Sequence, residues 1–446
     1  MIQRLLLTLA LTVVVLLAPG GASARPGDPS SPSARTPVTT VVDTTLPGAR
    51  FEYARRYWRV RAAEGRPPWL DVRHGKLVGR APRTGTWKVR LTEREIARRG
   101  GDTRRTVLVL KSVTPRAATG TVLITRGIGG RPANADSRDV TVSGDGSTVI
   151  FSSRATNLVP GTAESAGRLY VWDTASNLVS LLHPEHWADL LGVSDDGRRV
   201  LVGLTAGLFL LDRTDGSATQ VAERAVGAAL TADGERVLYQ DRGLELVSPE
   251  PQLLEWARAT GVTRTVIQDV QTRTFSGLSA DGRFALFVDY DASALFDTTT
   301  DTFGDLGRLG LEGGNADWVD VSDDGRMLSA RGSGLPSGSG SGGDAVAVVH
   351  DTLLGRSRGP ARGNTGTAIT TDGSHYAVAT AVRHLRVVER ATGTRTSPFT
   401  ARPSGQETWA SLSDDVSRVA YVSDGHDLLR GTRRGVANVY VWVRAR

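Results

Sequence analysis

Three pairs of adjacent carboxylates are the first residues in this sequence that could do chemistry. They are Asp195-Asp196, Asp323-Asp324 and Asp414-Asp415. Two neighbouring carboxylates can serve as general acid and general base. Each pair, however, contains the Asp of a short repeated motif, and the first Asp of the pair is replaced by other residues in other copies. We therefore interpret the pairs as solvated turn residues, and we predict no catalytic residue.

Two further patterns have a chemical precedent. Gly355 to Gly359 (GRSRG) matches the G-x-S-x-G nucleophile elbow, but that elbow needs a strand-to-helix turn, and this segment lies between predicted strands. His183 and His186 offer two metal ligands without a third. We therefore predict no metal site and no cofactor.

The repeated motif is an aliphatic residue, Ser or Thr, any residue, Asp and then Gly, followed by a β-rich run. Its seven Asp residues are Asp145, Asp196, Asp233, Asp281, Asp324, Asp372 and Asp415, and successive ones are 37 to 51 residues apart. A repeat of this length with several strands per copy is typical of a β-propeller blade. Within the repeat, Asp can accept backbone hydrogen bonds and Gly can take the left-handed conformation of a hairpin turn. We assign these Asp residues a structural role.

The ends of the repeat region predict how the propeller closes. The seventh copy stops after VYVWV, which leaves it without an outermost strand, and TVLITR (121–126) precedes the first copy. Pairing these two segments would remove exposed sheet edges and join the first blade to the last. We therefore predict an all-β fold: a seven-bladed propeller over 117–446, closed by an N-terminal strand.

The repeats resemble those of TolB-like propellers, which are related to WD-type repeats. The first copy, from Val142 to Asp173, follows the family pattern and includes its NLVPG loop (157–161). Val416 stands where Gly is expected, which questions the tightness of the last turn. The resemblance implies a scaffold for binding and, in some members, catalysis, and it does not define one function.

The residues before the propeller divide into three segments. Residues 1–24 have the basic start, apolar run and small-residue cleavage site of a secretory signal peptide. Residues 25–40 are a Pro/Ser linker. Residues 41–114 predict a small β-sandwich, in which Trp87, Val89 and Leu91 alternate along one strand and Val107 and Val109 along another. The chain has no cysteine, so its stability comes from the core without disulfides.

This module resembles the Ig or cadherin-like modules of bacterial surface proteins. The family's G-x-L-x-G-x-P-x-x-x-G-x-Y-like run is approximated by Gly75, Leu77, Gly79, Pro82, Gly85 and Trp87. Calcium-binding relatives have clustered acidic residues that this copy lacks, and we predict no calcium site.

Charge is unevenly distributed along the chain. Residues 41–112 contain 18 Lys or Arg and 7 Asp or Glu, so 18 − 7 = +11, whereas the whole chain carries +7. The excess predicts that the module contacts an anionic envelope polymer, although an Arg-rich genome would produce a similar solvated surface. We predict no nucleic-acid partner and no transmembrane segment.

The ligand face of the propeller is predicted from its aromatic residues. Trp318 and Trp409 each lie four residues before the repeat Ser, at the start of an innermost strand, and Trp187 lies in an entry loop nearby. Asp320 lies two residues beyond Trp318, on the same side of the strand. Such residues at a channel mouth suit sugar or peptide binding, although packing between blades is the commoner role of these indoles.

These features predict a secreted or envelope-associated monomer that binds a protein or polysaccharide ligand without catalysis. Two alternatives stay open. One is a propeller hydrolase or lyase acting on extracellular or cell-wall carbohydrate. The other is an envelope scaffold similar to TolB, although no N-terminal partner-binding domain of that type is recognisable.

Overall fold

The structure is a computed structural model in which nearly all regular elements are strands. It describes residues 38–47, 50–54, 58–96, 102–114, 119–162, 167–183, 188–241, 251–270, 273–288, 293–307, 316–333, 345–358, 364–380 and 384–444. The predicted signal peptide lies outside these residues. The one helical element within them is a short 3₁₀ turn, η1 (Ile128–Gly130). No helix of the described segments is long and apolar enough to cross a membrane.

The N-terminal module contains two sheets that enclose a common core. The four-stranded sheet has the order β1 (Val38–Thr45), β7 (Thr103–Ser112), β6 (Gly85–Glu95) and β3 (Trp58–Glu64). The three-stranded sheet has the order β2 (Arg50–Tyr53), β5 (Lys76–Arg80) and β4 (Leu70–Arg73). Buried side chains from both sheets, including Tyr53, Leu77 and Leu91, form one cluster. β1 runs parallel to β7 and the other pairs are antiparallel.

The alternation along β7 differs from the prediction. Leu108 and Leu110 are fully buried, whereas Val107 and Val109 are half-buried and point to the opposite face. The run VLVL is apolar at every position, so its periodicity does not say which face is the core. The fold decides, because only one face of this sheet packs against the β2-β5-β4 sheet.

In the described residues, seven four-stranded sheets follow the module, and we number them in chain order. Sheet 1 contains β11 (Ser137–Val142), β12 (Thr148–Ser153), β13 (Arg168–Asp173) and β14 (Leu178–His183), and sheet 2 contains β15 (Asp189–Val193), β16 (Arg199–Leu204), β17 (Gly207–Asp212) and β18 (Ala218–Ala222). Sheet 3 contains β19 (Ala228–Leu230), β20 (Arg236–Asp241), β21 (Gln252–Ala257) and β22 (Val262–Ile267). Sheet 4 contains β23 (Thr274–Leu278), β24 (Phe284–Val288), β25 (Ser293–Asp297) and β26 (Thr302–Gly307). Sheet 5 contains β27 (Ala316–Val321), β28 (Met327–Ser333), β29 (Ala345–Asp351) and β30 (Arg356–Arg358). Sheet 6 contains β31 (Asn364–Ile369), β32 (His375–Thr380), β33 (Arg386–Glu389) and β34 (Arg395–Thr396). Sheet 7 contains β35 (Glu407–Leu412), β36 (Arg418–Ser423), β37 (Asn438–Val443) and β8 (Thr121–Leu123). A small hairpin, β9 (Arg126–Gly127) and β10 (Arg131–Pro132), precedes sheet 1.

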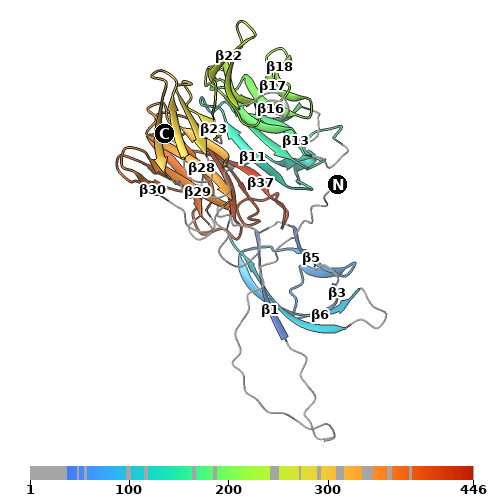
Figure 1. The fold of residues 1–446 in the computed structure, drawn as a ribbon. Helices are drawn as coiled ribbons and strands as arrows, with labels where there is room; N and C mark the ends of the chain where they lie inside the picture. The colour runs from blue at the N-terminus through green and yellow to red at the C-terminus, as the bar shows by residue number, and fades with distance from the viewer. Residues whose placement is uncertain are drawn as a thin grey trace, which may run out of the picture.

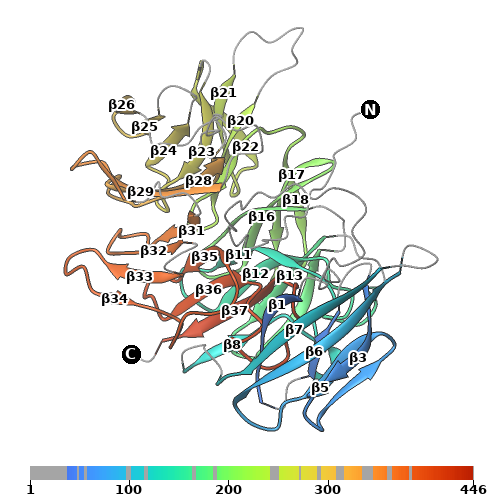
Figure 2. The ribbon, with the colours of Figure 1, turned by 90° about the horizontal axis from the view of Figure 1, so that it is seen from below.

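The sheets are arranged as a β-propeller. The first strand of each sheet contacts the first strand of the next, and β35 of sheet 7 contacts β11 of sheet 1. The contacts therefore form a closed ring, with the first strands innermost. Figure 1 shows the module as a separate unit below the sheets, and Figure 2 shows the sheets beside one another.

Sheet 7 takes its outer strand from the N-terminal side of the propeller. β8 pairs with β37, with Val122 opposite Val441, as the sequence predicts. Thr125 extends the contact, because its hydroxyl donates to Asn438 and accepts from the amide of Val439. The ladder joins residues more than three hundred positions apart, so both ends of the chain contribute to one sheet.

The repeat turns share one conformation, including the turn with the unexpected Val416. The six turn glycines have φ between 63° and 77°, and Val416 has φ 55° with its amide donating to Ser413 as in the other turns. A β-branched residue in this region costs about 1 kcal/mol or more. At other repeat turns a side chain of the preceding sheet occupies the space that a Cβ would need. A Cβ added to Gly325, for example, would lie 3.0 Å from the ring of Phe284. The buried Val416 instead packs its own side chain into the core between sheets 6 and 7.

Candidate functional site

The innermost strands enclose a cavity of about 460 Å³ along the propeller axis. Residues from the first strands of all seven sheets line it, from Val142 in sheet 1 to Leu412 in sheet 7. Most of the lining side chains are small or aliphatic, because strands crowded around one axis leave little room. This volume falls within the range of small-molecule sites.

The charged side chains that line this cavity all carry negative charge. They are Asp195, Asp320 and Asp414, and no Lys, Arg or His is among the lining residues that the structure describes. Hydroxyl groups of Thr141 and Ser411 add hydrogen-bonding capacity. The cavity therefore suits a ligand with a positive charge or several hydrogen-bond donors.

The first acids of the three carboxylate pairs gather where the repeat turns meet the axis, an end that we call the turn face. Asp195, Asp323 and Asp414 occupy the same position of their repeats, between the Ser and the turn Asp. A second cavity of about 430 Å³ opens there and is lined by Asp195, Asp196, Asp233, Asp281 and Asp323 among others. From the sequence we interpreted these first acids as turn residues and did not link them to one another. Closure of the ring brings them together.

Asp195 and Asp414 approach each other across Gly144. A Cβ on Gly144 would lie 2.5 Å from a carboxylate oxygen of each, so a larger residue there would collide with both. Burial, followed by the charges of Asp414 and Asp323, raises the pKa of Asp195 to about 6. Burial likewise raises the pKa of Asp323. Like charges this close disfavour simultaneous ionisation.

Backbone hydrogen bonds hold Asp195, Asp323 and Asp414 in place. The amide of Asp195 donates to Ala232 of the next sheet at 2.8 Å, and that of Asp414 donates to Gly144 at 2.9 Å. The amide of Asp323 donates to Thr371 at 2.8 Å, and the hydroxyl of Thr371 donates to Asp414 at 2.9 Å. The carboxylates are thus positioned by neighbouring sheets. Within the described residues no group of three or more His, Cys, Asp or Glu side chains has a metal-binding arrangement.

The seven repeat Asp residues lie at the turns themselves. In sheet 2 the Ser194 hydroxyl donates to Asp196 at 2.6 Å, and the Arg198 amide donates to the same oxygen at 3.0 Å. Equivalent contacts occur at all seven turns. Although burial acts in the opposite direction, these two donors lower the pKa of Asp196. The carboxylate therefore stays ionised as a turn constraint.

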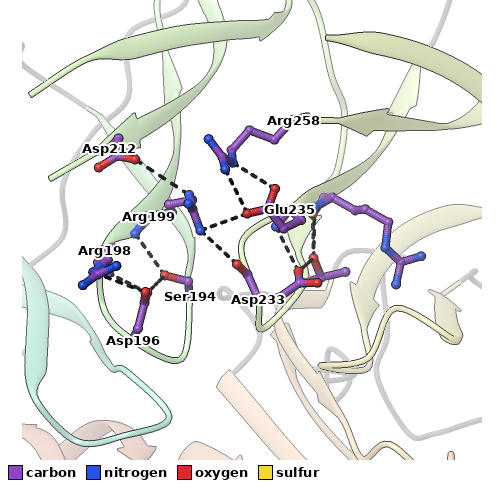
Figure 3. Close-up of polar contacts among 10 residues, drawn as sticks. Ser194, Asp196, Arg198, Arg199, Asp212, Asp233, Glu235 and Arg258 are labelled. Carbon is purple, nitrogen blue, oxygen red and sulfur yellow. Dashed lines mark hydrogen bonds and ion pairs between the residues drawn. The ribbon is translucent and has the colours of Figure 1, made fainter. Parts of the chain in front are cut away.

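Figure 3 shows how one such turn is tied to the next sheet. Arg199 of sheet 2 donates to the carbonyl of Asp233 in sheet 3 at 3.0 Å and lies 3.3 Å from the carboxylate of Glu235. Arg258 holds Glu235 from the other side with two hydrogen bonds of 3.0 Å. Arg199 thus connects sheet 2 to sheet 3, and Arg258 holds Glu235 within sheet 3. The first acids of the pairs take no part in these contacts and line the two cavities at the axis.

Comparison with known proteins adds structural likenesses of low identity. No protein-family model matches this sequence, and no curated protein matches it. An oligogalacturonate lyase in complex with manganese is 14% identical with a TM-score of 0.49, covering 75% of this chain and 96% of that one. The oligogalacturonate lyase of Vibrio parahaemolyticus is 12% identical with a TM-score of 0.47, covering 74% and 98%. The Cps50 (Swd1) β-propeller domain of Myceliophteria thermophila is 14% identical with a TM-score of 0.43, covering 73% and 100%.

The four predicted ligand residues do not share one site in the described structure. Asp320 lines the central cavity and accepts a hydrogen bond of 3.0 Å from Ser329 on the neighbouring strand. Trp409 is half-buried and packs against the core between sheets 7 and 1, and it is not among the cavity-lining residues. Trp318 lies in β27, paired with Arg331, but its side chain is outside the described part. Trp187 lies wholly outside the described residues, as does His186.

A second polar cluster, at the opposite ends of the strands, escaped the sequence analysis. Glu407 begins β35 and is 3% exposed; its Oε2 lies 2.8 Å from Nδ1 of His384, and Ser423 donates to its Oε1 at 3.3 Å. Nearby, the fully buried Asp427 accepts hydrogen bonds from the amide and hydroxyl of Ser404. Burial raises the pKa of Glu407 to about 8 and lowers that of His384. The one sequence signal was a Glu at the start of an innermost strand.

Proposed function

We propose that the protein is a secreted, non-enzymatic recognition protein built on a seven-bladed, TolB-like propeller and a basic Ig-like module. The observation that carries the proposal is the central cavity of about 460 Å³, to which all seven innermost strands contribute. Convergence of the repeats on one axis creates a concave site of ligand size. The lining offers hydrophobic contact and hydrogen-bond acceptors, as binding sites do.

The chemistry of the lining supports a particular class of ligand. Carboxylates of Asp195, Asp320 and Asp414 face a cavity whose described lining includes no basic side chain. A protein ligand with a Lys or Arg side chain would bring a compensating charge, and a polysaccharide would bring hydroxyl donors. The basic module would contact an anionic envelope surface independently.

The test is binding by the mature chain, residues 25–446. Envelope polysaccharides and Lys- or Arg-containing peptides are titrated calorimetrically, and each mixture is also analysed for released products. We expect the ligand to bind without being converted to a product. Asp320→Ala should reduce the affinity about tenfold, because a hydrogen bond to a buried charged group contributes about 1.5 to 3 kcal/mol. Asp305→Ala, on the exposed strand β26, is the control and should bind normally. Product release would favour the enzymatic alternative instead, and normal binding by Asp320→Ala would remove the cavity from the proposal.

A further inference from the structure

One face of the β1-β7-β6-β3 sheet, whose strands are labelled in Figure 2, carries exposed basic side chains. Val89 and Leu91 of β6 and Leu108 and Leu110 of β7 are buried in the core of the module. Because side chains alternate along a strand, the intervening residues point to the opposite face. That face, called here the basic face, carries Arg59, Lys88, Arg90, Arg94, Arg105 and Lys111, all exposed.

Within the described part of the module, the cations of the basic face form no ion pair, whereas other cations do. Arg104 pairs with Glu93 at 2.8 Å and Lys76 with Glu52 at 2.7 Å, both away from this face. Among the described residues, no ion pair involves a side chain of the basic face. Glu64, opposite Arg90 in the register, is the one acid at an outward position of the described part of β3, β6 and β7.

The arrangement also opposes stability. Arg59 and Arg94 lie directly opposite each other in the β3-β6 register. Like charges at such positions destabilise a sheet. A bound anion between the two guanidinium groups would reverse this repulsion.

The cations form a track along β6. Lys88, Arg90 and Arg94 point the same way, and two-residue steps along a strand are about 7 Å. Thr92 interrupts the row, but Arg105 lies beside it on β7. The track therefore continues for about 20 Å with no gap in positive charge.

We infer that the basic face binds a linear polymer of polyol phosphates, an inference that rests on the proposed contact between the module and an anionic surface. A linear track fits a linear polyanion. Trp58 and Trp87, the module's aromatic residues on β3 and β6, have the strand parity of the buried Val60 and Val89, so they lie on the other side. Sugars and nucleobases are recognised by stacking on aromatic rings. A face of cations without rings instead reads the charges of a phosphodiester backbone.

The experiment compares three forms of the mature full-length chain on immobilised poly(glycerol phosphate) at low and physiological salt. The face variant is Lys88→Glu with Arg90→Glu. The control is Arg224→Glu with Arg433→Glu, two exposed propeller residues, which changes net charge equally. We expect binding that falls steeply with salt, and a loss of about tenfold or more in the face variant. The control should stay within about twofold of the parent. Thermal melting should be unchanged in the control and only slightly lowered in the face variant, because all four side chains are exposed but Arg90→Glu places a second carboxylate opposite Glu64.

Parallel probes decide between sources of negative charge: polygalacturonate, single-stranded DNA and phosphatidylglycerol vesicles. Preference for any of them over poly(glycerol phosphate) overturns the polymer assigned here while leaving an anionic contact of the module in place. Equal losses in the face and control variants overturn the location. If the parent binds no probe at low salt, both the inference and the proposed anionic contact fail.

Discussion

Glu407 Oε2 lies 2.8 Å from His384 Nδ1 in the interior between sheets 6 and 7. Burial raises the pKa of the carboxyl and lowers that of the imidazole, so both groups are uncharged at neutral pH. In this state Glu407 donates to His384 and accepts from Ser423. A buried neutral pair of this kind connects local stability to pH.

Replacing Glu407 by Gln should remove a pH dependence of stability. The folded pKa of about 8 lies above the unfolded value, so the stabilisation is complete below about pH 4.5 and is lost as pH rises through 8. The parent should therefore lose stability between pH 5 and 9 more steeply than Glu407→Gln does. Urea unfolding across this range measures the slope, with Glu223→Gln on an exposed loop as control. A parent-to-variant difference that does not vary with pH would contradict the account.

Asp195→Asn should raise the free energy of unfolding of the protein at alkaline pH. The raised pKa of about 6 means that ionisation of Asp195 opposes folding, and this opposition grows as pH rises from about 4 through 6. At pH 8 we expect a gain on the order of 1 kcal/mol after solvent screening, and almost none at pH 4. Asp215→Asn, in an exposed turn, serves as the control. A gain that is equal at pH 4 and pH 8 would show that repulsion is not its source.

Removal of the closing strand should destabilise the whole propeller. Deleting residues 118–126 removes β8 and the contacts of Thr125 with Asn438 and Val439, so sheet 7 loses its outer ladder. We expect the propeller to unfold in a single cooperative transition at a lower temperature than in the parent, and calorimetry measures this temperature. Deleting nine residues of the linker, 26–34, should leave melting unchanged. Equal melting of both deletions would refute closure through β8.

Trp409→Ala should reduce stability more than ligand binding. The side chain packs against the core between sheets 7 and 1. Because it is half-buried, the loss should be about 2 to 3 kcal/mol, below the range for fully buried aromatic residues. Denaturant titration measures this loss, and the binding assay with Asp320→Ala as comparison measures affinity. Weakened binding at unchanged stability would instead place the indole at a ligand site, as the original prediction had it.

Features set by neighbours in the chain could be predicted from the sequence. The Ser194–Asp196 contact and the Arg199 amide that donates to Ser194 lie within five residues of each other, so Ser-x-Asp-Gly contains its own turn chemistry. Repetition of that motif indicated a propeller. The missing last strand indicated the pairing of β8 with β37, because a sheet edge left open is unfavourable.

Tertiary structure decided which side chains meet. Asp195 and Asp414 are 219 positions apart and converge on Gly144 only because the ring closes. His384 and Glu407 belong to different sheets, and no local pattern links them. The apolar run of β7 is compatible with either face until a second sheet covers one of them. In each case the deciding contact comes from a distant segment, and its approach depends on how whole sheets pack.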